Sequence, residues 1–283
     1  MAARSFKQEL VGVFGQPVAE NPTQVMVEAA FRALGLDWRY LTIEVAPAGL
    51  PDAVRGMRAM GFRGVNLTIP HKVAVVPLLD ELTPAARAIG AVNCVVRQGE
   101  RLLGENTDGK GFLQSVEEHG SVAGRSAVLL GAGGAARAIG VELLRAGAAS
   151  ITVVNRSPDR GRELVAVLDA VAKGRSRFVP WEGDYAVPEG TDLVVNATSI
   201  GLHPDVEARV PLDVGTLRPG MLVCDVIPNP PRTRLVREAE ARGCVALDGL
   251  GMLVNQGVIG VRLWTGREPD PKVMRQALLE VFG

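Results

Sequence analysis

A glycine-rich turn follows an apolar, strand-like run and precedes an alanine-rich segment, an order typical of sites that bind dinucleotide phosphates. The turn lies within residues 128–137, and its spacing matches G-x-G-x-x-G/A. Gly131 would permit the tight turn, Gly133 would let the backbone approach a pyrophosphate, and Ala136 would let helix and strand pack closely. The N-terminus of the following helix would direct N–H groups at the phosphates. Glycine turns also serve plain strand-to-helix connections, but the flanking pattern favours a dinucleotide site with the cofactor-binding residues Gly131, Gly133, Gly134 and Ala135.

The end of the next expected strand, near residues 151–154, indicates which dinucleotide binds. An NAD site usually carries Asp or Glu there to accept hydrogen bonds from the ribose, whereas this chain has Asn155 and Arg156. Arg156, with Arg160 one helical turn later, can donate charge-assisted hydrogen bonds to a ribose 2′-phosphate. The pattern therefore favours NADP, bound in part by these three residues. The alternative is that both arginines are solvated at a helix start capped by Ser157.

Three polar segments, residues 64–72, 90–94 and 104–109, could hold a polyhydroxylated substrate. Asn66 and Thr68 alternate with apolar residues, so both side chains would share one face at a strand end. Pro70 would stop that strand and place Lys72 at the start of a helix.

Hydride transfer between a nicotinamide and an alcohol carbon needs a group that moves the hydroxyl proton. Lys72 paired with Asp108 fits this requirement. Burial can lower the pKa of a lysine towards neutrality, and a neighbouring carboxylate favours its charged form and fixes its position. The alternative is a surface lysine and an aspartate that only caps a helix near Gly109, but their placement beside Asn66, Thr68 and Asn93 favours catalysis.

Strands and helices alternate along the chain, which predicts an α/β fold with parallel sheets. We expect two domains: an N-terminal α/β substrate domain over residues 1–107, completed by closing helices within 250–283, and a Rossmann-type NADP-binding domain over 108–249. The substrate would bind in a cleft between them. The expected strands lie near residues 10–14, 40–45, 64–68, 127, 151, 178, 193, 221 and 245, with a hairpin formed by 91–96 and 101–104.

Composition narrows the class of protein further. The 283 residues carry 31 basic and 31 acidic side chains, which offers no electrostatic reason to bind nucleic acid or an anionic membrane. The first nine residues lack the apolar core of a signal peptide, so we expect a cytoplasmic protein. The three cysteines are expected to be reduced and buried, and the three histidines lack metal-ligand spacing, so no metal is expected.

The chain as a whole resembles the shikimate dehydrogenase family, which reduces 3-dehydroshikimate with NADPH. The resemblance runs from residues 13–17 (Val-Phe-Gly-Gln-Pro) to residues 249–256 (Gly-Leu-Gly-Met-Leu-Val-Asn-Gln). It includes the glycine turn and the blocks at residues 155–157, 196–201 and 225–230 in the same order and spacing.

The resemblance implies roles for individual residues. Lys72 and Asp108 would be the catalytic pair, and the closing helices would pack onto the substrate domain. It also implies a step in aromatic amino acid biosynthesis through chorismate, by a monomer or homodimer. Ring hydroxyls would be bound by Asn66, Thr68, Asn93 and Gln256, and the nicotinamide side would be lined by Asn196, Thr198 and Met252.

Departures from the family pattern cluster where the substrate carboxylate would bind. The family usually has a histidine and a Ser-Lys-Ser-Pro stretch, and this chain has Glu20-Asn21-Pro22-Thr23-Gln24. Asn21 and Thr23 stand at the serine positions and can still donate hydrogen bonds to an acid, although Glu20 would repel one unless it points to solvent. Pro228 replaces a usual tyrosine.

The spared Lys72 and Asp108 imply unchanged chemistry, with shikimate as the expected substrate. Substrate drift towards quinate or another hydroaromatic acid is the alternative. A ligand sensor without turnover is a remote one, disfavoured because both catalytic candidates are retained.

Overall fold

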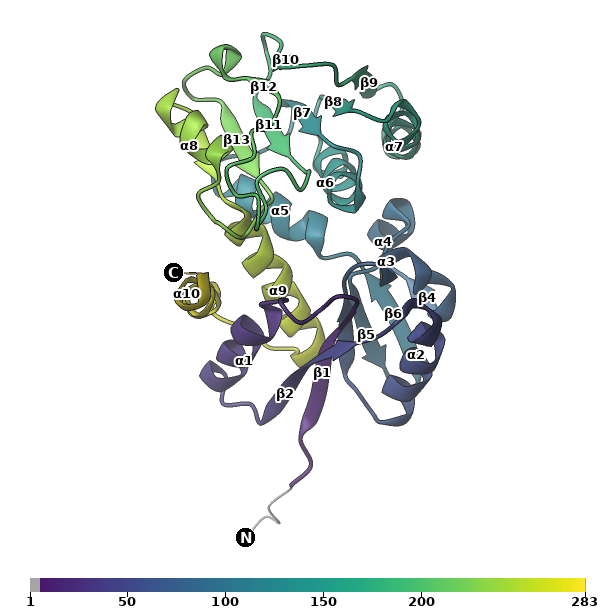
Figure 1. The fold of residues 1–283 in the computed structure, drawn as a ribbon. Helices are drawn as coiled ribbons and strands as arrows, with labels where there is room; N and C mark the ends of the chain where they lie inside the picture. The colour runs from purple at the N-terminus through teal and green to yellow at the C-terminus, as the bar shows by residue number, and fades with distance from the viewer. Residues whose placement is uncertain (1–5, 283) are drawn as a thin grey trace. The chain divides into compact units, whose positions relative to one another are not determined.

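A computed structural model describes residues 6–282, which form two compact units (Figure 1). The first unit comprises residues up to Thr107 and from Gln256 onward, and the second comprises Asp108–Asn255. The chain leaves the second unit within α9 (Gly249–Thr265), whereas the sequence placed this return at residue 250. Residues 1–5, part of the stretch expected not to be a signal peptide, lie outside the described residues.

The first unit contains a mixed six-stranded sheet with the strand order β2-β1-β3-β5-β6-β4. Strand β1 pairs in parallel with β2 and β3, whereas β5 is antiparallel to both β3 and β6. The antiparallel β5–β6 pair is the expected hairpin. The strands are β1 (Glu9–Gly15), β2 (Trp38–Glu44), β3 (Gly64–Leu67), β4 (Glu81–Leu82), β5 (Cys94–Gln98) and β6 (Arg101–Glu105).

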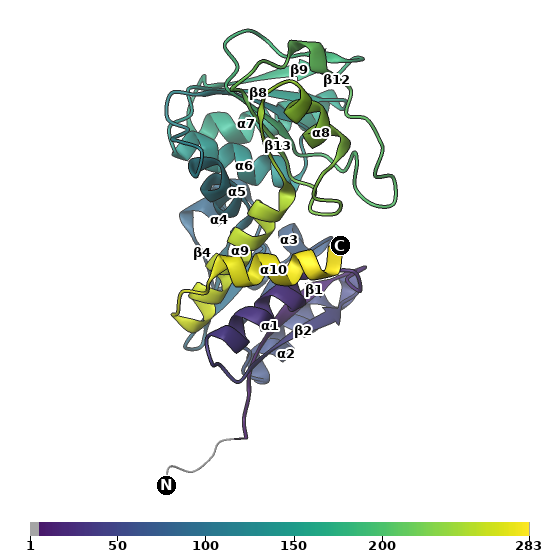
Figure 2. The same cartoon turned by 90° about the vertical axis from the view of Figure 1, so that its left-hand side faces the viewer.

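Helices pack on both faces of this sheet. Apolar residues of α2 form a core with Val65 and Leu67 of β3. Helices α1 and α10 lie side by side (Figures 1 and 2), and Gly257 of α9 permits close contact with Met26 and Met274. The helices are α1 (Thr23–Ala33), α2 (Leu50–Ala59), α3 (His71–Ala74), α4 (Pro84–Ile89), the second part of α9 and α10 (Pro271–Phe282), with 3-10 turns η1 (Pro47–Gly49) and η2 (Val76–Leu78).

The second unit contains a parallel six-stranded sheet with the order β14-β13-β11-β7-β8-β9. The first three of these strands in the chain lie on one side of the β7–β11 boundary and the last three on the other. That is the doubly wound order, in which ligands bind where the winding reverses, beyond the carboxyl ends of β7 and β11. The strands are β7 (Ser126–Leu130), β8 (Ser150–Asn155), β9 (Ser176–Pro180), β11 (Leu193–Asn196), β13 (Leu222–Asp225) and β14 (Val245–Leu247).

The helices of the second unit connect these parallel strands. Helix α7 has the predicted start, with the Ser157 side chain accepting a hydrogen bond from the Arg160 amide and Pro158 in the first turn. The helices are α5 (Asp108–Glu117), α6 (Gly134–Arg145), α7 (Pro158–Val171), α8 (Arg234–Ala241) and the first part of α9, and a small sheet pairs β10 (Tyr185–Ala186) with β12 (Leu212–Asp213), which leads into η3 (Val214–Thr216).

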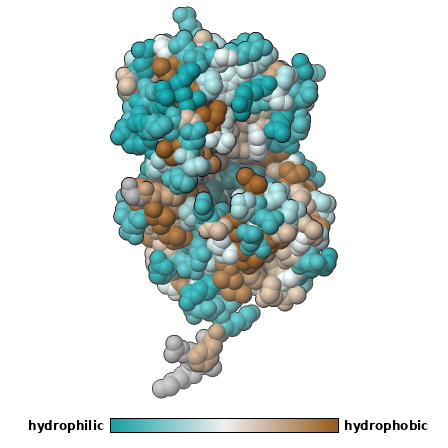
Figure 3. Space-filling view, in the orientation of Figure 1, coloured by the Kyte–Doolittle hydropathy of each residue, from teal (hydrophilic) through white to brown (hydrophobic). Residues whose placement is uncertain are grey.

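Within residues 6–282, no helix combines the length and the hydropathy needed to cross a bilayer. On the face shown in Figure 3, apolar side chains form small patches among hydrophilic ones. All three cysteines are buried and, within the part of the chain that the structure describes, none forms a disulfide, as expected.

Candidate active site

The glycine turn lies at the carboxyl end of β7, at the point where the winding of the second sheet reverses. Gly131 has φ +103°, and a Cβ atom on it would lie 2.9 Å from Thr198 Cγ2 and 3.1 Å from the carbonyl oxygen of Ala197. Both the backbone conformation and the close approach therefore require glycine at this position. By contrast, a Cβ on Gly133 or Gly134 would meet no atom within 4 Å.

This open space lies at the start of α6, where no described side chain caps the helix. The first N–H groups of an uncapped helix lack intrahelical partners and attract anions. Ala136 is fully buried, as expected for a residue that packs helix on strand. The residues of the turn therefore suit a dinucleotide pyrophosphate.

Two arginines follow the end of β8. Arg156 and Arg160 are both exposed, and within residues 6–282 no ion pair engages either guanidinium. Asn155 donates a hydrogen bond from Nδ2 to the Ser157 carbonyl at 2.9 Å, which fixes the turn that presents Arg156. Two solvated guanidinium groups beside a ribose site would suit a phosphate.

A buried carboxylate lies at the end of β13, next to the end of β11. Asp225 is 2% exposed and accepts hydrogen bonds from Asn196 Nδ2 at 3.0 Å, Thr233 Oγ1 at 2.8 Å and the Ile227 amide at 3.2 Å. Burial raises the pKa of Asp225 to about 6, although these three hydrogen bonds oppose the rise. In the sequence this residue stood out only as part of the block at residues 225–230.

Asn196 is itself fully buried, with 0% exposure. Its Oδ1 accepts hydrogen bonds from the Thr198 amide and hydroxyl, at 3.2 and 2.7 Å. The Thr198 hydroxyl in turn accepts a hydrogen bond from the Ile200 amide at 3.1 Å. Thr198 is partly buried and its methyl group faces Gly131.

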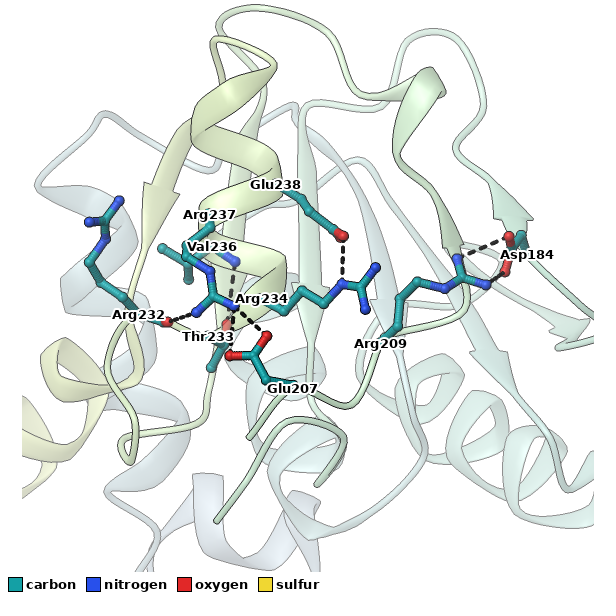
Figure 4. A network of polar contacts seen from close by, with 9 residues as sticks. All are labelled: Asp184, Glu207, Arg209, Arg232, Thr233, Arg234, Val236, Arg237 and Glu238. Carbon is teal, nitrogen blue, oxygen red and sulfur yellow. Dashed lines mark hydrogen bonds and ion pairs between the residues drawn. The ribbon is translucent and has the colours of Figure 1, made fainter. Parts of the chain in front are cut away.

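Ion pairs brace the outer side of this region (Figure 4). Arg237 of α8 contacts both carboxylate oxygens of Glu207, at 2.7 and 2.9 Å, and so ties α8 to the segment after β11. Arg209 of the same segment pairs with Asp184. Thr233, drawn below Val236 in Figure 4, caps α8 by accepting a hydrogen bond from the Val236 amide.

The first unit contains a chain of buried, uncharged hydrogen-bonding groups. Asn66 donates from Nδ2 to the Asn93 carbonyl at 2.9 Å, and the fully buried Tyr40 hydroxyl donates to Asn66 Oδ1 at 2.7 Å. Asn93 Oδ1 accepts from the Thr107 amide at 2.7 Å, and the Thr107 hydroxyl lies 3.5 Å from Gln256 Oε1. The predicted substrate residues Asn66, Asn93 and Gln256 thus form one buried group.

Tyr40 and Thr107 complete this chain. Tyr40 was missed in the sequence because it lies in a β-strand where an aromatic residue is ordinary, and Thr107 was included only as part of the segment 104–109, without a role of its own. Burial holds the pKa of Tyr40 well above its usual range, so the phenol stays protonated and acts as a donor.

Backbone hydrogen bonds hold Lys72 next to this group. The Val92 amide donates to the Lys72 carbonyl at 2.8 Å, one residue from Asn93. His71, which is fully buried, places Nε2 2.7 Å from the Val45 carbonyl and so anchors the start of α3. Lys72 and Thr68 are partly buried.

Asp108 is the first residue of α5 and belongs to the second unit, as does the partly buried Met252 of α9. Gly109 packs so closely on α6 that a Cβ there would lie 2.3 Å from the Ala138 carbonyl oxygen. This contact fixes where α5 begins. The pairing of Asp108 with Lys72 of the first unit stays a prediction.

The two residues at the family's serine positions start α1. The Thr23 amide donates to Asn21 Oδ1 at 3.0 Å, and the nearby Thr23 side chain opposes the rise in the pKa of Tyr40. Thr23 is 5% exposed, Asn21 is partly exposed and Glu20 is exposed. The amide of Thr23 therefore has a partner within the protein, and its side chain is buried.

Family models match most of the chain. A model described as "Shikimate dehydrogenase substrate binding domain" matches residues 13–95, one described as "Shikimate / quinate 5-dehydrogenase" matches 114–200, and one described as "Shikimate 5'-dehydrogenase C-terminal domain" matches 249–279. A curated relative from Moorella thermoacetica, "Shikimate dehydrogenase (NADP(+))", is 45% identical over 278 residues, which are 97% of this chain and 94% of the relative.

The chain belongs to the shikimate dehydrogenase family.

Solved structures of shikimate dehydrogenase family members and similar proteins share the whole fold. Shikimate 5-dehydrogenase from Thermus thermophilus, in complex with NADP(H) and shikimate, is 38% identical with a TM-score of 0.86, covering 96% of this chain and 99% of that one. The ligand-free 5-ketofructose reductase of Gluconobacter sp. strain CHM43 is 50% identical with a TM-score of 0.95, covering 98% of this chain and 100% of that one. Similar folds in this set thus carry names with two different substrates.

Proposed function

We propose that this protein is an NADP-dependent shikimate dehydrogenase, which transfers hydride reversibly between NADPH and 3-dehydroshikimate to give shikimate. The observation that carries the proposal is similarity to the curated NADP-dependent shikimate dehydrogenase over nearly the full length of both chains. Because the match includes both units, it covers the expected cofactor and substrate residues together.

The second unit would hold the cofactor. The open space at Gly133 and Gly134 and the uncapped start of α6 fit the pyrophosphate, and Asn155, Arg156 and Arg160 would bind the ribose and its 2′-phosphate. When bound, NADPH supplies the hydride. The segment that includes Thr198 and the residue Met252 would face the nicotinamide.

The first unit would hold the substrate. Asn66, Thr68, Asn93 and Gln256 would bind the ring hydroxyls, because these side chains are neutral and the hydrogen bonds of Asn66 and Asn93 hold their amide groups in fixed directions. Lys72 would give a proton to the carbonyl oxygen as the alcohol forms, and Asp108 would hold the lysine in place.

A second candidate substrate is 5-ketofructose, which carries no carboxylate. The Gluconobacter reductase that acts on it is 50% identical to this chain. The burial of Thr23 favours this candidate, because this residue is 5% exposed and its amide already donates to Asn21 Oδ1, which leaves little of Thr23 for a substrate carboxylate. The partly exposed Asn21 supplies the more accessible donor of this pair of residues, from Nδ2.

A substrate panel tests the proposal. Purified protein is assayed for nicotinamide reduction with shikimate and with quinate, and for NADPH oxidation with 5-ketofructose. The proposal predicts the highest kcat/KM with shikimate. A highest kcat/KM with 5-ketofructose would favour the second candidate. A highest kcat/KM with quinate would indicate that the substrate has changed to another hydroaromatic acid. Tight NADPH binding without turnover of any of the three would indicate a ligand sensor.

Thr23→Ser combined with Asn21→Ser tests the carboxylate end directly. These changes restore the serines usual in the family, so they should lower the KM for shikimate if the carboxylate binds there. An unchanged ratio of kcat/KM between shikimate and 5-ketofructose would remove the argument from Thr23.

We further propose that the enzyme works in the cytoplasm as a monomer or homodimer on a small molecule, without nucleic acid or membrane. The relative named a shikimate dehydrogenase supports the small-molecule substrate. Light scattering of the purified protein tests the oligomeric state.

A further inference from the structure

The proposed hydride and proton transfers do not use the buried carboxylate of Asp225, yet three segments of the second unit donate hydrogen bonds to it. Its donors come from the end of β11, from its own loop and from the start of α8. An ionised carboxylate only accepts hydrogen bonds. Asp225 therefore determines which atom of the Asn196 amide faces it.

The orientation of Asn196 passes on to Thr198. Because Asn196 Nδ2 faces Asp225, Oδ1 faces the opposite way and accepts both the amide and the hydroxyl of Thr198. If the amide turned over, its NH2 group would face the Thr198 amide, a donor against a donor. The Thr198 methyl group, held this way, lies against Gly131 in the glycine turn.

We infer that Asp225 is a positioning residue of the cofactor site, which acts through Asn196 to hold Thr198 and its segment against the glycine turn. Asn196 has no exposed surface, so it acts from beneath the site. This inference rests on the proposed NADP-dependent function. It assigns to Asp225 a role in binding the nicotinamide half of the cofactor.

A purely structural role would act through α8 instead. Thr233 joins Asp225 to the start of α8, and Arg237 joins α8 to Glu207 in the segment after β11 (Figure 4). Loosening α8 at Arg237 leaves the bonds among Asp225, Asn196 and Thr198 intact. Arg237→Gln is therefore a matched control.

The experiment compares Asp225→Leu, Asp225→Asn and Arg237→Gln by NADPH fluorescence titration and steady-state kinetics. Leucine removes every acceptor, so the NADPH Kd and the KM for NADPH should rise at least about tenfold, with the KM for the ketone substrate changed less than about threefold. Asparagine keeps one carbonyl oxygen for Asn196 and should restore most of the affinity. The Arg237→Gln Kd should stay within about threefold of the parent value.

Thr198→Val covers the case in which Asp225→Leu fails to fold. Valine keeps the methyl group against Gly131 and removes only the hydroxyl, so NADPH affinity should fall here as well. Folded variants that bind NADPH as the parent does would overturn this inference alone, as would an equal loss in Arg237→Gln. A parent protein that binds no NADPH would overturn the proposed function and this inference together.

Discussion

In the buried group that contains Asn66, Asn93 and Tyr40, one carbonyl oxygen determines which atoms donate hydrogen bonds and which accept them. The Asn93 carbonyl can only accept, so Asn66 must direct Nδ2 at it and Oδ1 at Tyr40, whose hydroxyl must then donate. The side chain of Asn66 is left with one free N–H donor. A ligand would therefore meet a fixed pattern of neutral groups, which suits hydroxyl groups on a substrate.

Lys72→Met should lower kcat by at least about 100-fold, because it removes the proposed proton donor while keeping most of the aliphatic stem. The NADPH Kd should stay unchanged, since the lysine lies in the first unit. Steady-state kinetics and fluorescence titration measure the two values. Lys272→Met on α10 is the control, and a Lys72→Met variant as active as that control would disprove the role.

Arg156→Ala should raise the KM for NADP about 10- to 100-fold and leave the KM for NAD nearly unchanged, because it removes a charge-assisted bond that only the 2′-phosphate can accept. The matched control is Arg162→Ala, also exposed near the start of α7 but paired with Asp159. An unchanged ratio of the two KM values would contradict the choice of NADP.

At the scale of the structural elements, the glycine turn is the segment whose local sequence most directly determines the proposed cofactor site. A side chain at Gly131 meets both an unfavourable φ of +103° and the atoms of residues 197 and 198. Gly131→Ala should therefore weaken NADPH binding by at least about tenfold and lower stability by roughly 1–3 kcal/mol.

Gly174→Ala separates the two causes. Gly174 also has a positive φ, of +73°, but a Cβ there meets no atom within 4 Å. It should lose a similar amount of stability from strain and bind NADPH normally, as thermal unfolding and titration would measure. Equal NADPH affinity of the two variants would show that the close approach at Gly131 is unimportant.

The main strands and longer helices could be predicted because each combines a clear apolar pattern with turn residues at its ends. Helix α8 was missed, since it has only eight residues, half of them charged, and its strongest signal is the Thr233 cap. Helix α4 begins with the equally short signal Thr83-Pro84. Two-residue strands such as β4 were missed because pairing with a distant strand defines them, and local sequence does not encode that.

Part of the candidate site could be predicted in the same way. The motif residues could be predicted because the type of residue alone indicates its use: glycine permits tight turns, and lysine and arginine supply positive charge. The roles of Tyr40, Thr107 and Asp225 depend on long-range contacts; Tyr40 and Asn66, for example, are 26 positions apart in the sequence. The predicted cleft between the domains and the pair formed by Lys72 and Asp108 stay predictions.

At the scale of the whole molecule, ionisation of Asp225 makes the free energy of unfolding depend on pH. Burial raises its pKa from an ordinary 3.8 to about 6, so between these values the folded state binds more protons than the unfolded state. Its contribution to the free energy of unfolding is therefore largest below about pH 4, falls as pH rises to about 6, and stays constant above that.

Asp225→Asn removes this contribution. The free energy of unfolding of the variant minus that of the parent should therefore increase by roughly 1–3 kcal/mol from about pH 4 to about pH 7. Denaturant unfolding of both proteins at both pH values measures this increase. Comparing the variant with the parent cancels the other carboxylates, such as Asp184, whose pKa is lowered by Arg209. A difference that does not vary with pH would mean that Asp225 ionises at its ordinary pKa.

The measurement to make first is the initial rate of nicotinamide reduction with shikimate, with NADP and with NAD at equal concentrations. The proposed function predicts rapid reduction of NADP and much slower reduction of NAD. Absence of NADP reduction by a folded protein that binds NADPH would contradict it, and would indicate that the changes at Asn21 and Thr23 have altered the substrate.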